Sequence, residues 1–231
     1  MKLVLFDIDG TLLSTDGAGR RAITRALVEV YGVAGPDDHR FDGKTDPQIV
    51  HELMALAGIA PQRVEAGLQV VFERYAEFLR WELTSTAHTT VPNPGVPELL
   101  DALEMRGDVI LGLLTGNVVP GARAKLGAAG ILPSRFVVGA FGSDHAVRAE
   151  LPAIAHARAK VILGVDLPAG DVTIIGDTPA DLTCGRGIGA RGVGVATGHY
   201  SVDDLAGYGA AAILPDFRDT AAAVRGILGE P

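Results

Sequence analysis

The sequence predicts an α/β fold in which a doubly wound parallel sheet carries an inserted group of helices. Short apolar runs, typical of strands buried on both faces, recur in residues 1–14 and 91–231. Amphipathic stretches separate these runs, and such alternation of strand and helix is typical of βαβ units. Residues 15–90 hold helical patterns instead. We therefore expect a core domain of residues 1–14 plus 91–231 and a helical domain of residues 15–90.

The first element is an apolar run at residues 3–6, which predicts a buried strand.

Asp46 fits the N-terminal cap of a helix in the inserted region, and Trp81 is expected in that region's core. Residues 84–97, rich in Thr and Pro, are expected to return the chain to the sheet. Apolar residues at helical spacing predict three helices in the insert, at about residues 23–31, 47–57 and 61–82.

The remainder of the chain alternates between the two kinds of element. Strands are predicted by short apolar runs, which occur at about residues 109–114, 135–140, 171–175, 193–196 and 211–214. Helices are predicted between and after them, at about residues 97–105, 120–129, 150–161, 179–189 and 220–228.

Composition excludes several classes of function. The net charge of −8 argues against a surface that binds nucleic acid or an anionic membrane. Cys184 is the single cysteine, so no internal disulfide can form, and it is expected to be a small helix residue and not a nucleophile, because no motif surrounds it. The chain shows neither an N-terminal secretory pattern nor an uninterrupted apolar stretch of about 18 residues. We expect a cytoplasmic monomer or homodimer whose partner is a small molecule.

Two carboxylates follow the first strand directly. Asp7 and Asp9 are two residues apart, so in an extended segment both side chains point to the same side. Two like charges at such a spacing are costly unless a cation or a shared proton compensates them. A hard divalent cation with oxygen ligands is the natural partner.

Two further motifs follow later strands. Thr115, Gly116 and Asn117 come after the run at 109–114 and offer a hydroxyl and backbone amides to an anion. Asp177 and Asp181 come after the run at 171–175, in the pattern Gly-Asp-x-x-x-Asp. Because ligands bind at the carboxyl ends of parallel strands, these motifs are expected at one edge of the sheet.

The segment Asp7-x-Asp9-Gly10-Thr11 resembles the first motif of the haloacid dehalogenase superfamily in its phosphatase form. The later motifs follow in the family's order, and residues 15–90 match its C1-type α-helical cap in order and size. The resemblance, which is to the phosphoglycolate phosphatase-like members, implies a Rossmann-like core, Mg²⁺ as cofactor and an aspartyl-phosphate intermediate.

The resemblance also implies roles for individual residues. Asp7 corresponds to the nucleophile, and Asp9 to the general acid and base, whose backbone carbonyl also holds the metal. Asp177 corresponds to a side-chain metal ligand, and Asp181 to a supporting residue that holds metal-bound water or orients the loop. The phosphate would be bound by three residues of the second motif, Thr115, Gly116 and Asn117.

The third family motif supplies one cation near the nucleophile, usually a lysine. Here Arg148, next to the start of a predicted helix, is assigned to that role. A guanidinium binds phosphate in a bidentate manner, but it is longer and flatter than a lysine ammonium. Lys160, 17 residues before Asp177 (177 − 160), is the rival, and the sequence leaves the choice open.

The insert is expected to exclude water and to recognise the leaving group. Its loop at residues 43–46 resembles the substrate-specificity loop of relatives that act on small phosphate esters, so Lys44 and Asp46 are candidate substrate contacts. Arg20 and Arg21 are candidates for a second anionic group. The histidines at positions 51, 88, 145, 156 and 199 lack partner spacing and are expected at the surface.

The leading interpretation is a Mg²⁺-dependent phosphatase for a small phosphorylated metabolite, with phosphoglycolate as the first guess by analogy. The alternatives are a β-phosphoglucomutase-like phosphomutase, a 2-haloacid dehalogenase, a phosphonate hydrolase that uses Lys44 as a Schiff base, and a degenerate relative that only binds ligands or a partner. A histidine soon after the first motif would favour the mutase, but Gly17, Ala18 and Gly19 stand there.

Overall fold

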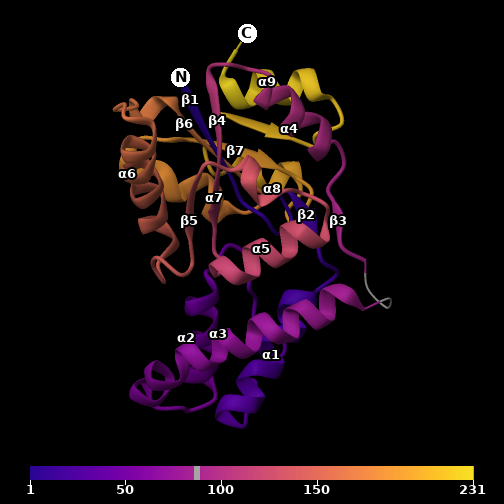
Figure 1. Ribbon diagram of the computed structural model, residues 1–231, viewed down its shortest axis with the longest axis vertical. Helices are drawn as coiled ribbons and strands as arrows, with labels where there is room; N and C mark the ends of the chain where they lie inside the picture. The colour runs from indigo at the N-terminus through magenta and orange to yellow at the C-terminus, as the bar shows by residue number, and fades with distance from the viewer. Residues whose placement is uncertain (86–88, 231) are drawn as a thin grey trace.

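The computed structural model describes residues 1–85 and 89–230. Figure 1 shows a sheet with helices on both of its faces and a separate group of helices beyond the carboxyl ends of the strands. The sheet has six parallel strands in the order β5-β4-β1-β6-β7-β8, which confirms the predicted α/β class. The strands are β1 (Lys2–Phe6), β4 (Val109–Thr115), β5 (Val138–Phe141), β6 (Val172–Gly176), β7 (Arg191–Val195) and β8 (Ala212–Leu214).

Strand β1 lies in the middle of the sheet, and its side chains alternate between two apolar layers. Leu3 and Leu5 face one layer, whereas Val4 and Phe6 face the other, and all four are fully buried. The first layer is closed by α6 (Leu151–Leu163) and α7 (Pro179–Cys184), and the second by α4 (Val96–Glu104), α5 (Val119–Ala128) and α9 (Thr220–Leu228). Burial on both faces explains the uninterrupted apolar run of β1.

The inserted helices are α1 (Ala18–Tyr31), α2 (Asp46–Leu56) and α3 (Pro61–Thr84). They enclose an apolar cluster of their own, to which Leu27, Leu53 and Tyr75 contribute. The two connections to the sheet run side by side as an antiparallel pair, β2 (Leu13–Ser14) and β3 (Val91–Pro92). The sequence did not predict this pair, because two-residue strands are too short to show a periodicity.

Several predicted elements differ from the observed ones. The strand expected at 135–140 begins at Val138, because Pro133–Arg135 form a 3₁₀ turn before it. The helix expected at 179–189 ends at Cys184, where a 3₁₀ turn over Gly185–Ile188 continues the chain. Helix α8 (Val202–Ala206), which is capped by the Ser201 hydroxyl, was not predicted.

Trp81 was wrongly predicted to be a core residue. It lies off the apolar stripe of α3 and is 60% exposed. His88 and part of the expected linker at 84–97 lie outside the described residues. Within residues 1–85 and 89–230, no helix combines the length and the apolar character needed to cross a membrane.

Candidate active site

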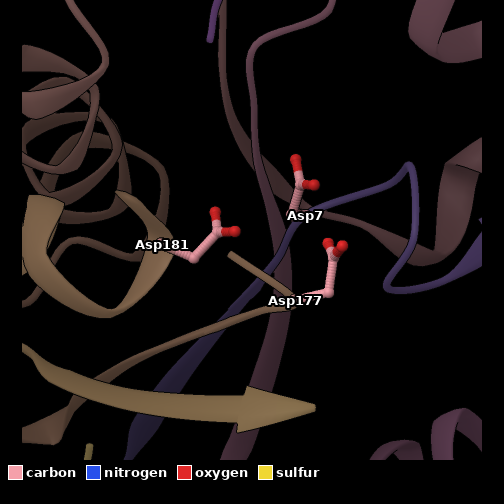
Figure 2. Close-up of side chains that lie close together, drawn as sticks. All are labelled: Asp7, Asp177 and Asp181. Atoms are coloured by element: carbon pink, nitrogen blue, oxygen red, sulfur yellow. The ribbon is translucent and has the colours of Figure 1, made fainter. Parts of the chain in front are cut away.

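Three buried aspartates meet at the carboxyl ends of β1 and β6. Asp7 follows β1, Asp177 follows β6, and Asp181 lies in the first turn of α7. Because β1 and β6 are parallel neighbours, their ends lie side by side, and one carboxylate oxygen from each aspartate lies within 4.8 Å of the others. Figure 2 shows the three carboxylates gathered around one space.

This crowding changes how the aspartates hold protons. Burial, with added repulsion from Asp181 and Asp9, raises the pKa of Asp7 to about 7, although the Arg148 charge opposes the shift. Burial and the charges of Asp181 and Asp7 raise the pKa of Asp177 well above its usual value. The cluster therefore favours binding of either protons or a cation.

Arg148 supplies a positive charge beside Asp7. It begins a 3₁₀ turn before α6, is 6% exposed, and its Nη2 lies 3.1 Å from Asp7 Oδ1. The same nitrogen contacts Asp181 Oδ1. Lys160 instead points outward and pairs with Asp166 at 2.7 Å. Of the two basic candidates, Arg148 is the one that lies next to Asp7.

Besides contacting Arg148, Asp181 caps the start of α7. Its Oδ2 accepts hydrogen bonds from the backbone amide of Thr178 at 3.0 Å and from the Thr178 hydroxyl at 2.6 Å. The Thr178 hydroxyl in turn accepts from the Asp181 amide, which completes a capping box. Asp181 thus orients the loop that carries Asp177.

Asp177 is held by the first motif. The Thr11 hydroxyl donates to Asp177 Oδ1 at 3.1 Å. Gly10 has φ +77°, and a Cβ there would lie 2.3 Å from Asp177 Oδ2, so a side chain at this position would collide with the carboxylate. The Gly-Thr of the first motif is therefore explained by the close approach of Asp177.

The Asp9 carboxylate is turned toward α5. Lys125 Nζ donates to Asp9 Oδ1 at 2.8 Å and to Oδ2 at 2.7 Å, and Asn117 Nδ2 donates to Oδ2 at 2.7 Å. The Asp9 side chain remains 43% exposed. Lys125 was not among the sequence candidates. Its position three residues after Ala122 and one before Leu126 places it on the buried face of α5, and a lysine on that face was a detectable signal.

The second motif follows β4, on the other side of β1. Thr115 is fully buried, and its hydroxyl accepts from Asn117 Nδ2 at 2.9 Å and from the Asn117 amide at 3.3 Å. Gly116 and Asn117 line the same cavity as Asp7, whereas Thr115 is fully buried and does not line it. Direct phosphate binding by these residues stays a prediction.

The insert docks on the second motif through its loop at residues 43–46. The Asp46 amide donates to the Gly116 carbonyl at 2.7 Å, and Asp46 Oδ2 accepts from the Val118 amide at 2.8 Å. A Cβ on Gly116 would lie 2.1 Å from the Lys44 carbonyl oxygen, so this approach requires glycine. Burial raises the pKa of Asp46 to about 6, and the Asp9 charge adds to this shift. The Lys125 charge and the hydrogen bond from the Val118 amide oppose it.

The predicted cap of α2 was displaced by one residue. Thr45, not Asp46, is the N-cap, and its hydroxyl accepts from the Gln48 amide at 3.2 Å. Lys44 lines the cavity, but its Nζ pairs with Glu52 at 2.5 Å and lies 3.1 Å from His39 Nε2.

A cavity of about 420 Å³ lies between the sheet edge and the insert. Arg20 lines it, with its guanidinium 3.7 Å above the Phe41 ring and its Nη2 donating to the His39 carbonyl at 2.8 Å. Arg21 does not line it and instead pairs with Glu82 at 2.6 Å, so the grouping of Arg21 with Arg20 was wrong.

Two further expectations concern nucleophiles and bases outside the cluster. Cys184 lies in α7, as expected of a helix residue, and its burial there raises the pKa of its thiol to about 12, which makes it a poor nucleophile. His199 is exposed, as expected, but it lines the cavity and its Nδ1 lies 2.8 Å from Asp42 Oδ1. Its partner lies 157 residues away in the sequence, so no local spacing could have indicated it.

Comparison with known proteins gives consistent results. A family model described as haloacid dehalogenase-like hydrolase matches residues 4–186. The N-acetylmuramic acid 6-phosphate phosphatase of Pseudomonas aeruginosa is 30% identical over 219 residues, which cover 94% of this chain and 91% of the relative. The phosphoglycolate phosphatase of Rhodospirillum rubrum is 31% identical over 220 residues, which cover 94% of this chain and 88% of the relative. A crystal structure of a hydrolase from Pseudomonas syringae superposes with a TM-score of 0.74 at 21% identity, covering 98% of this chain and 99% of that one.

Proposed function

The chain belongs to the haloacid dehalogenase-like hydrolases and is a phosphoric monoester hydrolase, and from this we propose a Mg²⁺-dependent phosphatase that acts on a small phosphorylated metabolite through an aspartyl-phosphate on Asp7. One observation carries the proposal: a buried carboxylate, Asp7, lies at a strand end with the Arg148 guanidinium 3.1 Å away and Asp177 close by. A carboxylate attacks a phosphate dianion only where positive charge screens their repulsion.

The donor set suits Mg²⁺. Asp7 and Asp177 offer carboxylate oxygens within one small space, and the family resemblance adds the Asp9 carbonyl. A few oxygen ligands, with the rest of the shell left to water and substrate, are typical of Mg²⁺ sites. Burial raises the pKa values of Asp7 and Asp177 and the neighbouring carboxylates add to the shift, so a bound cation would stabilise the ionised forms, which supports the proposal. When bound, Mg²⁺ would supply the charge that screens the nucleophile from the phosphate.

The chain's own residues would carry two steps. In the first, an Asp7 oxygen attacks phosphorus, the bond to the ester oxygen breaks, and Asp9 gives that oxygen a proton. In the second, water attacks the phosphorus of the aspartyl-phosphate, Asp9 takes the water's proton, and Asp7 is released with inorganic phosphate. Arg148 would hold phosphate oxygens beside Asp7 in both steps.

The cavity favours a substrate that carries a second polar or anionic group. Arg20 and Lys44, which both belong to the insert, line the cavity. Both named relatives act on phosphorylated acids, and a volume of about 420 Å³ admits a phosphoglycolate or a phosphorylated sugar acid. We propose phosphorylated carboxylic acids as the substrate class, with phosphoglycolate as the first member to test.

Release of inorganic phosphate from a panel of esters tests this function. The panel contains phosphoglycolate, N-acetylmuramic acid 6-phosphate, glucose 6-phosphate and p-nitrophenyl phosphate, each with Mg²⁺ and with excess chelator. We expect turnover with Mg²⁺, the highest kcat/KM for an ester that carries a carboxylate, and loss of activity with the chelator. Absence of turnover on every ester would refute the phosphatase. Activity on a 2-haloacid that survives the chelator would favour the dehalogenase instead.

Binding of Mg²⁺ should also depend on pH. Protons and Mg²⁺ compete for the Asp7 carboxylate, whose pKa burial raises to about 7, so Mg²⁺ binding should weaken as the pH falls through 7. At pH 8 and about 100 times its dissociation constant, Mg²⁺ should raise the free energy of unfolding by about 2.7 kcal/mol. At pH 6 and the same concentration, the gain should be about 1.4 kcal/mol smaller.

Thermal unfolding with and without Mg²⁺ measures this difference. The Asp177→Asn variant is the control and should lose most of the stabilisation at both pH values. An equal gain at pH 6 and pH 8 in the wild type would contradict a site that includes Asp7.

A further inference from the structure

Lys125 is a buried lysine in the wall of the active-site cavity. It lies on α5, is 4% exposed, and shares its inward helix face with Ala122 and Leu126. Lysine is almost never buried without a partner, because removing an ammonium group from water is costly. Its position therefore calls for a specific set of acceptors.

Those acceptors belong to the first and second motifs. Lys125 Nζ donates to both carboxylate oxygens of Asp9, at 2.8 and 2.7 Å, and to Asn117 Oδ1 at 2.6 Å. The ammonium thus donates to three acceptor atoms of two side chains. Asn117 Nδ2 completes the ring by donating to Asp9 Oδ2 at 2.7 Å. Lys125 and Asn117 thus hold the Asp9 carboxylate on its α5 side, while its exposed side faces the cavity.

The inserted helices close the other side of the ammonium. Tyr75 on α3 packs closely on α5, because a Cβ added at Gly121 would lie only 3.3 Å from the Tyr75 hydroxyl oxygen. A Cβ at Gly19 on α1 would lie 3.1 Å from Lys125 Nζ and 3.7 Å from the same hydroxyl. The ammonium is therefore largely enclosed between the sheet edge and the insert, and Lys125 is 4% exposed.

The charges around Lys125 keep it protonated. Burial alone lowers the pKa of the ammonium, but the nearby Asp9 carboxylate, the Tyr75 hydroxyl and the Asp46 carboxylate raise it above its usual value. Lys125 is therefore a fixed cation and not a proton donor at working pH.

We propose that Lys125 is a positioning residue for Asp9, which it holds at the cavity wall with the Asn117 amide and the Tyr75 hydroxyl as supports. The proposal deepens the function above and rests on Asp9 as the acid and base. In the first step the proton passes from Asp9 to the leaving oxygen as the P–O bond breaks. In the second, Asp9 takes a proton from water as the new P–O bond forms. Lys125 keeps its three protons throughout.

A comparison of leaving groups separates this role from a structural one. p-Nitrophenolate leaves as a stable anion and needs no proton, whereas the alkoxide from phosphoglycolate does. Hydrolysis of the aspartyl-phosphate is the same for both esters and also uses Asp9, so the esters are compared in the first step, as the single-turnover rate at which the leaving group is released. The Lys125→Met variant should lower this rate for phosphoglycolate, or for whichever alkyl ester the panel selects, by about 10²-fold. The rate for p-nitrophenyl phosphate should fall by less than about tenfold, and the substrate concentration that gives half the maximal rate should change little for both. A structural role would lower both rates equally.

Two further variants complete the test. Tyr75→Phe removes only the hydroxyl beside Lys125 and should give the same unequal loss at a smaller size, which keeps the test usable if Lys125→Met fails to fold. Arg123→Met removes a cation from the exposed side of the same helix and should leave both rates unchanged.

The outcomes distinguish the two proposals. A wild type that hydrolyses neither ester overturns the proposed function and, with it, the role of Lys125. A wild type that hydrolyses both, with variants that lose both rates equally or lose neither, overturns the role of Lys125 alone.

Discussion

Replacing Asp7 with asparagine should lower kcat by at least about 10³-fold on every ester that the wild type hydrolyses. The amide has the shape of the carboxylate but is a far weaker nucleophile, so the aspartyl-phosphate cannot form. Folding should be retained, because Asp7 is buried among other carboxylates and its pKa is raised to about 7, which means that its ionised form is disfavoured in the metal-free protein. Steady-state kinetics and thermal unfolding at pH 7.5 measure the two effects.

Asp166→Asn is the matched control. Asp166 is exposed and pairs with Lys160, away from the cavity, so kcat should stay within about twofold of the wild type. Rapid quenching of the wild type with substrate, followed by mass measurement, should show a phosphorylated peptide that contains Asp7. An Asp7→Asn variant that keeps activity within tenfold of the wild type would show that another group attacks phosphorus.

Replacing Arg148 with methionine should destabilise the protein by about 3–5 kcal/mol, since it leaves two buried carboxylates without their cation. Arg148 is 6% exposed and contacts both Asp7 and Asp181. The loss should be larger at pH 8 than at pH 5. Without the guanidinium, the folded-state pKa of Asp7 rises further, so its contribution to stability is fully present below the unfolded-state pKa of 3.8 and is lost progressively as the pH rises to the folded-state pKa.

Denaturant unfolding at the two pH values, in the presence of chelator, measures these changes. Lys160→Met removes the rival basic residue, which is 59% exposed at its side chain, and should shift the free energy of unfolding by less than about 0.5 kcal/mol. Adding Asp181→Asn to Arg148→Met should recover part of the loss, because one of the unpaired charges is then absent. A loss that is equal for Arg148→Met and Lys160→Met would contradict the buried ion pair.

The sequence predicted the fold well wherever apolar runs were long enough to bury a strand on both faces. The run before Asp7 and the run before Asp177 became neighbouring parallel strands, so the two aspartates met at one edge. Short elements escaped prediction because two residues at Leu13–Ser14 show no periodicity. Trp81 was misplaced because aromatic character indicates burial only on the helix face that packs.

The candidate site was harder to predict where it depends on contacts between distant residues. Lys125 and Asp9 are 116 residues apart, and no local pattern links them. A lysine within the buried spacing of α5 was the one available signal. Arg148 lies in the region where the third motif was expected. Preferring it to Lys160 required knowledge of the path of the chain after β5, which brings Arg148 to Asp7 and leaves Lys160 outside the site.

The paired connections at Leu13–Ser14 and Val91–Pro92 have a consequence for how this architecture can be altered. Because the chain leaves the sheet and returns to it at adjacent positions, residues 15–90 begin and end side by side. Grafting a module of different length at this junction would need little extra loop-closure entropy, and the register of the six strands would be undisturbed. The length and sequence of the inserted segment can therefore change without a shift in strand register, provided that the insert residues that contact the core, such as Asp46 and Tyr75, are kept.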